Sequence, residues 1–148
     1  MNENNVLGVV LAGGKSQRFG QDKVEATLGN KTLIEHTLDK IKFKFEDVII
    51  VSQKTNFKDY KIINDCIDGQ LGPLVGVLSA MKWIKKNNKP YGWVATFPCD
   101  TPFFDTKIIL ELKKASLTNS KKLFFIKSGE KRHNIFGLWS LDLINILE

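Results

Sequence analysis

The sequence has few of the features that mark secreted, zinc-binding or membrane proteins. Its two cysteines, Cys66 and Cys99, lie far apart and form no C-x-x-C pair. This spacing excludes a zinc ribbon and gives no sign of a disulfide scaffold, so we expect buried or incidental thiols. No apolar run approaches the roughly 20 residues of a membrane span, and the polar start MNENN is not typical of a signal peptide. We therefore expect a soluble, cytoplasmic protein with no membrane partner.

Arginine is scarce in a chain that is otherwise basic. The 148 residues carry 22 Lys and Arg against 16 Asp and Glu, a net charge of +6, and Arg18 and Arg132 are the two arginines. Such a charge favours acidic partners, nucleotides and nucleic acids among them. A nucleic-acid-binding protein would show a continuous basic face with stacking aromatics. Because Trp83 and Trp93 fit core positions instead, we expect no nucleic-acid partner and keep that class as an alternative.

Short apolar runs alternate with amphipathic segments, which is the pattern of α/β proteins. The length and a hydrophobic share of 43% suit one domain, residues 1–148, with its own core. The first run is apolar almost throughout, as expected for a strand that is buried on both faces. The predicted strands are Val6–Ala12, Asp47–Ser52, Tyr60–Asn64, Gly92–Pro98, Leu123–Ile126 and Ile135–Trp139.

Helices are predicted between these strands from capping residues and apolar stripes. Thr32 and Glu35 form a capping-box pattern, Pro73 suits a first helical position, and Asp105 could cap a third helix. The sum is a three-layer, doubly wound, mostly parallel sheet of the Rossmann-like type. The expected core stripes, in three helices, are Ile34, Leu38, Ile41 and Phe45; Leu74, Val77, Leu78, Met81 and Ile84; and Ile108, Leu112 and Ala115.

A glycine-containing loop follows the first predicted strand. Gly13 and Gly14 let the backbone turn sharply and bring its N–H groups close to a ligand. Lys15, Arg18 and Lys23 add three cations within nine residues. Bare amides together with positive charge are what a triphosphate needs. The spacing fits neither a P-loop, which would need glycine at position 9, nor the G-x-G-x-x-G dinucleotide motif.

The loop resembles the L-A-G-G-x-S-x-R-x-G-x-D-K signature of GT-A-like nucleotidyltransferases, and most closely that of the molybdenum cofactor guanylyltransferase (MobA) family. Related cytidylyltransferases tend to read L-A-A-G, so Gly13 favours guanine. Later segments also resemble the family: Asp65 with Gly72–Gly76, the P-C-D-x-P motif Pro98–Pro102, and His133–Trp139. The nine specified signature positions that match are Leu11, Ala12, Gly13, Gly14, Ser16, Arg18, Gly20, Asp22 and Lys23.

Polar residues follow four predicted strands directly, and in a doubly wound sheet ligands bind beyond the carboxyl ends of the strands. Residues 13–23, Ser52, Asp65 and Asp100 should therefore meet at one edge of the sheet. His36, on a predicted helix, is expected to be structural. His133 is placed in a late loop, where a substrate contact and a surface position are both open.

The resemblance assigns roles to these residues. It implies that Leu11, Ala12, Gly13, Gly14 and Gly72 contact the nucleotide and that Lys23 binds its phosphates. Asp65 would contact the base or ribose, unless it only makes an Asx turn. Asp100 would hold Mg²⁺, and Ser52 stands where the family often has Asn. Arg18 and Lys15 would stabilise the departing pyrophosphate.

The implied reaction is Mg²⁺-dependent transfer of GMP from GTP to the terminal phosphate of molybdopterin. Molybdenum-cofactor biosynthesis proteins and acceptor enzymes are implied as partners. The alternatives are a cytidylyltransferase or other nucleotidyltransferase of this fold, and a GTP-binding module without catalysis. The family's C-terminal segment has no counterpart after Asp142–Glu148, so the acceptor is the least determined part of the prediction.

Overall fold

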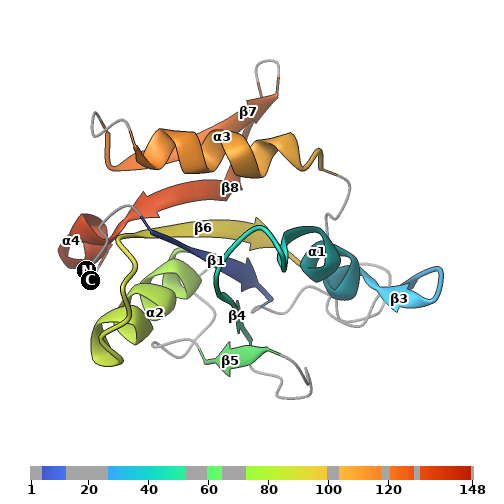
Figure 1. Cartoon of the computed structure of the whole chain (residues 1–148), viewed down its shortest axis with the longest axis horizontal. Coiled ribbons are helices and arrows are strands. Elements are labelled where there is room, and N and C mark those ends of the chain that lie inside the picture. Colours follow the sequence, from blue (N-terminus) through green and yellow to red (C-terminus); the bar gives the residue numbers. More distant parts are fainter. Residues whose placement is uncertain are drawn as a thin grey trace.

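The fold centres on a six-stranded sheet in the order β5-β4-β1-β6-β8-β7 (Figure 1). The computed structural model describes residues 5–12, 27–52, 60–64, 73–99, 104–117, 121–128 and 131–147. Strands β5, β4, β1 and β6 are parallel, and β8 runs antiparallel between β6 and β7. The mostly parallel α/β sheet predicted from the sequence is therefore confirmed. The strands are β1 (Val6–Leu11), β4 (Val48–Val51), β5 (Lys61–Ile63), β6 (Trp93–Pro98), β7 (Leu123–Ser128) and β8 (Lys131–Ser140).

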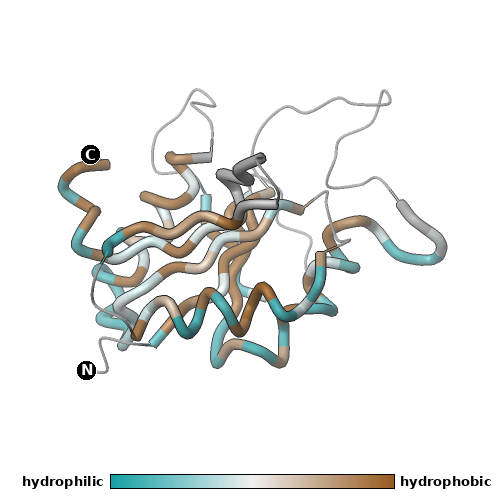
Figure 2. Tube along the Cα trace, turned by 90° about the horizontal axis from the view of Figure 1, so that it is seen from above, coloured by the Kyte–Doolittle hydropathy of each residue, from teal (hydrophilic) through white to brown (hydrophobic). Residues whose placement is uncertain are grey.

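Two helical layers enclose this sheet. Helices α1 (Leu33–Ile41) and α3 (Lys107–Ser116) pack on one face, and α2 (Pro73–Lys86) and α4 (Ile144–Leu147) pack on the other. A 3₁₀ turn, Leu141–Leu143, precedes α4. Hydrophobic colours run along the central strands in Figure 2, and the surrounding helices alternate between hydrophobic and hydrophilic residues. Along β1 successive side chains alternate between the two cores, so that Val10 joins the α1 and α3 side and Val9 the α2 side.

Capping contacts fix the start of two helices as predicted. In α1 the Thr32 hydroxyl accepts from the Glu35 N–H at 3.2 Å, and the Glu35 carboxylate accepts from the Thr32 N–H at 3.4 Å. In α3 the Asp105 carboxylate accepts from the Lys107 N–H at 3.0 Å. Thr106, the residue at the N-cap position, makes no side-chain capping bond. Helix α1 ends at Ile41, so Phe45 is buried beyond the helix rather than on its face.

The predicted stripes need two corrections. Leu74 is 51% exposed, whereas the other predicted stripe residues of α2 are buried. Gly76 already packs on Leu11, the last residue of β1, so the turn that holds Leu74 has no strand left to cover. In α3 Leu112 is buried as predicted, whereas the predicted Ile108 and Ala115 are only half-buried against the core, and the neighbouring Ile109 and Ser116 are buried instead.

A short hairpin between β1 and α1 was not predicted. Strands β2 (Thr27–Leu28) and β3 (Lys31–Thr32) pair antiparallel around Gly29, which has a φ of +69°. Glycine adopts this left-handed backbone without the steric cost that a side chain would bring. Strands of two residues are too short to show an alternation of apolar and polar residues. The turn residues Gly29 and Asn30 were therefore the available sequence signal for this hairpin.

Candidate nucleotide site at the carboxyl ends of the strands

Four parallel strands end in the same row. Leu11 of β1 is paired with Val51 of β4 on one side and with Pro98 of β6 on the other. Val51 is in turn paired with Ile63, the last residue of β5. We call this row of four residues the carboxyl rim. The predicted convergence of the strand ends is confirmed by this register.

Backbone hydrogen bonding of the sheet continues for one residue past the rim. The Ala12 N–H donates to the Val51 carbonyl at 2.9 Å, and the Ser52 N–H donates to the Ile63 carbonyl at 2.9 Å. Ala12, Ser52 and Cys99 are all buried. The ligand contacts predicted for Leu11, Ala12 and Ser52 would therefore be made by backbone groups and by the Ser52 hydroxyl. The free thiol of Cys99 is buried, as expected.

The residues that carry most of the predicted chemistry lie outside the described ranges. They are Gly13, Gly14, Lys15, Arg18, Lys23, Asp65, Gly72 and Asp100. In the sequence Gly13 follows Ala12, Asp65 follows Asn64 and Asp100 follows Cys99, so each begins where a described rim strand ends. Among the described residues no group of three His, Cys, Asp or Glu side chains could hold a metal ion.

The strand order marks where a ligand should bind along the rim. From β1 the chain builds β4 and β5 on one side and then crosses to β6 on the other side (Figure 1). The order therefore reverses between β1 and β6, and a crevice opens at such a switch point in doubly wound sheets. Gly13 and Asp100 follow the two strands that flank it. The topology thus favours a ligand between these two segments.

Helix α2 points its N-terminus toward the same rim. A Cβ at Gly76, in its first turn, would lie 2.8 Å from Leu11 Cδ2, closer than side chains normally approach. Glycine at this position lets the helix lie against the last residue of β1. The first turn of α2 contains no acidic residue, so its partial positive charge is not offset from within the helix.

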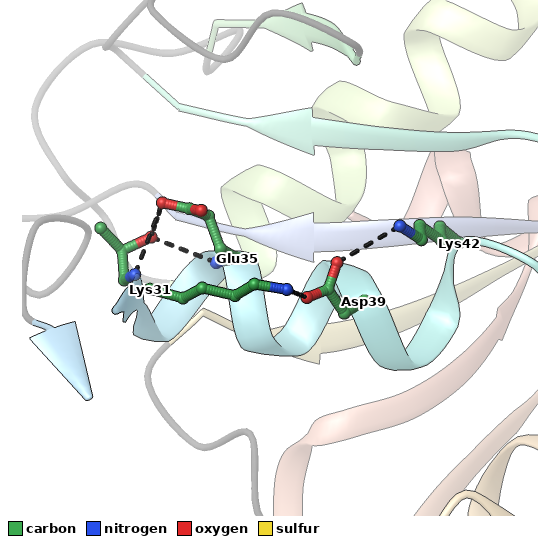
Figure 3. A network of polar contacts seen from close by, with 5 residues as sticks. Lys31, Glu35, Asp39 and Lys42 are labelled. Atoms are coloured by element: carbon green, nitrogen blue, oxygen red, sulfur yellow. Dashed lines mark hydrogen bonds and ion pairs between the residues drawn. The ribbon is translucent and has the colours of Figure 1, made fainter. Parts of the chain in front are cut away.

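Helix α1 contacts the hairpin β2–β3 and Phe104, which are the first described parts of the chain after two of the sequence motifs. Asp39 makes ion pairs with Lys31 of the β2–β3 hairpin and with Lys42, the latter at 3.4 Å (Figure 3). The hydrogen bond from Lys31, with Lys42 adding to it, lowers the pKa of Asp39 against a smaller opposing effect of desolvation. The same bond raises the pKa of Lys31.

The next residue of α1 reaches the chain that follows Asp100. Lys40 Nζ donates to the Phe104 carbonyl at 2.6 Å and lies 4.8 Å from the centre of the Phe104 ring. Phe104 stacks on Phe97 of β6 with 5.6 Å between ring centres, and it meets Phe136 of β8 edge-on at 5.2 Å. This cluster joins the end of β6 to the strand that bears the late family motif.

The two histidines take different places. His36 is half-buried on α1, as predicted. The backbone of His133 lies within β8, paired with Ile126 next to a register shift, so its placement in a loop was wrong. The strand begins at Lys131, earlier than the apolar run that predicted it, because the polar residues Lys131, Arg132 and His133 pair with β7 through their backbone.

Comparison with known proteins identifies the family. Residues 8–148 match the family model described as MobA-like NTP transferase domain. The chain belongs to this family. It is therefore an enzyme of the nucleotidyltransferase class, as the sequence predicted.

Relatives in sequence and structure agree with this assignment. The chain is 34% identical over 145 residues to a molybdenum cofactor guanylyltransferase of Rhizobium leguminosarum, and the match covers 98% of the chain and 68% of that relative. The crystal structure of molybdopterin-guanine dinucleotide biosynthesis protein A from Archaeoglobus fulgidus has the same fold, with a TM-score of 0.77 at 21% identity, covering 95% of this chain and 70% of that one.

The fold extends to enzymes that use another nucleotide. A 2-C-methyl-D-erythritol 4-phosphate cytidylyltransferase from Francisella tularensis matches with a TM-score of 0.65 at 17% identity over 97% of this chain and 76% of that chain. Fold alone therefore does not select the base. In the described ranges no helix has both the length and the apolar character that crossing a bilayer requires.

Proposed function

We propose that the protein transfers GMP from GTP to the terminal phosphate of molybdopterin and releases pyrophosphate. The observation that carries this proposal is the common register of Leu11 and Pro98, because Gly13 and Asp100 follow these strands closely at the switch point. Family membership and the relatives named molybdenum cofactor guanylyltransferase support the reaction class and the two substrates.

The proposed division of labour follows the charge of the reacting groups. A phosphate oxygen of the acceptor attacks the α-phosphorus of GTP, and the bond from that phosphorus to the β-phosphate oxygen breaks. Lys23 stabilises the α-phosphate, and Lys15 and Arg18 stabilise the departing pyrophosphate. Nucleotidyl transfer needs little covalent help, so positioning and charge neutralisation account for most of the rate.

Nucleotide binding is proposed to involve mainly backbone groups. Leu11, Ala12, Gly13 and Gly14 would approach the nucleotide through their amides and carbonyls, since Ala12 offers only a buried methyl group. Gly72, which directly precedes the first residue of α2 in the sequence, would contact the nucleotide as well. Asp65 and the Ser52 hydroxyl would face the base or ribose from the ends of β5 and β4.

Asp100 is proposed to hold Mg²⁺. Magnesium in nucleotide enzymes is commonly bound by one or two carboxylates together with substrate phosphates, so one aspartate at the end of β6 is a suitable donor. When bound, the ion would neutralise charge on the phosphates.

Further proposals concern the organisation of the protein. We propose that residues 1–148 act as a single nucleotidyltransferase domain in the cytoplasm. Proteins that supply molybdopterin and enzymes that accept the finished cofactor are its expected partners.

Pyrophosphate release tests the function directly. Purified protein is incubated with molybdopterin, Mg²⁺ and either GTP, CTP or ATP, with molybdopterin omitted in parallel. We expect release with GTP that depends on molybdopterin. Release only with CTP would establish the cytidylyltransferase alternative, and GTP binding without release would establish the non-catalytic module. Equal affinity for the three nucleotides would contradict the guanine preference.

A further inference from the structure

Helix α1 contacts two segments whose relative positions matter for the proposed function. We call residues 13–23 the nucleotide loop. The hairpin β2–β3 is the first described element after it, and Phe104 is the first described residue after the segment 100–103. Both are bonded to α1, through the neighbouring residues Asp39 and Lys40. One helix therefore contacts both the hairpin and Phe104, which are the first described parts of the chain after residues 13–23 and after residues 100–103.

The Lys40 contact is suited to fixing a chain position. It joins residues 64 apart in sequence, the acceptor is a backbone carbonyl and the contact is partly buried at 2.6 Å. A charged donor makes such a bond stronger than a neutral pair. The ammonium also lies over the Phe104 ring, which in turn contacts the rings of Phe97 and Phe136. Movement of Phe104 would disturb all three contacts together.

The Asp39 contact gives the hairpin an anchor that its own pairing lacks. Two-residue strands form little backbone pairing, and isolated hairpins are marginally stable in water. Lys31 is held to Asp39, and the capping box at Thr32 holds the start of α1 directly after β3. Figure 3 shows the ion pairs of Asp39 and the capping contacts of Glu35 along α1.

From these contacts we infer that Asp39 and Lys40 are positioning residues for nucleotidyl transfer: α1 sets the place of the nucleotide loop through Asp39 and of the Asp100 segment through Lys40. This inference rests on the proposed function. The inference assigns neither residue a contact with the substrates. Asp39 would act through the hairpin and Lys40 through Phe104.

Four variants separate positioning from general stability. Lys40→Met keeps the length of the side chain but removes the donor, Lys40→Arg keeps a charged donor, and Asp39→Asn removes the ion pairs. Lys85→Met, on the exposed last turn of α2, is the matched control for the loss of one positive charge. Thermal melting checks that each variant is folded.

The kinetic readout is GTP-dependent pyrophosphate release. We expect Lys40→Met to lower kcat roughly ten- to a hundredfold, as small misplacements of reacting groups do, with little change in the KM for GTP. Asp39→Asn should mainly raise that KM. Lys40→Arg should recover most of the loss, and Lys85→Met should match the wild type.

Hydrogen exchange of the free protein supplies a readout that does not depend on activity. In Lys40→Met the amides of residues 104–109 should exchange faster, while those of the hairpin should not, and Asp39→Asn should show the reverse. An active wild type with Lys40→Met equal to Lys85→Met in rate and exchange would overturn the inference alone. A wild type that releases no pyrophosphate from any nucleotide would overturn the proposed function and the kinetic role with it.

Discussion

Replacing Gly76 by alanine tests how the start of α2 is placed against β1. The new Cβ would lie 2.8 Å from Leu11 Cδ2, while Leu11 Cγ and Val51 Cγ1 remain at an ordinary 3.8 Å. The contact thus falls on one methyl group of a half-buried side chain. Leu11 precedes the nucleotide loop, so its displacement affects the proposed site as well as the core.

Two terms of opposite sign set the stability of this variant. Alanine favours the helix over glycine by about 0.5–1 kcal/mol. Overpacking of a core contact costs about 1–3 kcal/mol, and the mobile end of a leucine places the cost near the lower limit. We therefore expect the free energy of unfolding to change by no more than about 1 kcal/mol. Nucleotide affinity should fall about tenfold, equivalent to about 1.4 kcal/mol, because the strand end moves.

Urea unfolding and titration with GTP measure the two effects separately. The double variant Leu11→Val with Gly76→Ala removes the crowded δ-methyl group, and we expect it to recover most of the affinity. Unchanged GTP affinity in Gly76→Ala would refute the argument that α2 and β1 must approach closely. A loss of affinity that the double variant does not relieve would show that the Leu11 contact is not its cause.

Three further predictions concern chemistry, packing and pH. Lys23→Ala and Asp100→Ala should each abolish transfer while thermal melting stays cooperative, and an active, folded Asp100→Ala enzyme would refute the metal assignment. Thr96→Val should lower the free energy of unfolding by about 1–3 kcal/mol in urea, because the buried indole N–H of Trp139 donates to the Thr96 hydroxyl at 3.1 Å. Burial raises the pKa of Tyr91 above its usual value, so its contribution to stability is complete below pH 10.0 and is lost as the pH rises further; melting of Tyr91→Phe should show a smaller alkaline decline than the wild type.

The strands and their convergence followed from the sequence because buried parallel strands read as apolar runs. Val6–Leu11 and Trp93–Pro98 are buried on both faces, and parallel strands share one carboxyl end, so the rim needed no knowledge of side-chain contacts. The β2–β3 hairpin escaped prediction because its strands have two residues each.

Long-range contacts of the site lay beyond sequence reasoning. Lys40 and Phe104 are 64 residues apart. The helical pattern of the sequence does not indicate which lysine donates a hydrogen bond to a distant carbonyl. The exposure of Leu74 depends on where the sheet ends beneath α2. The spacing of apolar residues predicts the inner face of a helix but not the position of that sheet edge. His133 was misplaced because a polar segment can extend a strand through backbone pairing alone.

A crystal structure with a non-hydrolysable GTP analogue and Mg²⁺ tests the central claim most directly. We predict that the triphosphate lies across the ends of β1 and β6, wrapped by residues 11–23 and facing Asp100. At the opposite end of β4 lies a second groove of about 400 Å³, and its lining includes Tyr60, Trp83, three lysines and the acidic residues Glu46 and Asp47. An analogue bound there, with nothing at the carboxyl rim, would contradict the account.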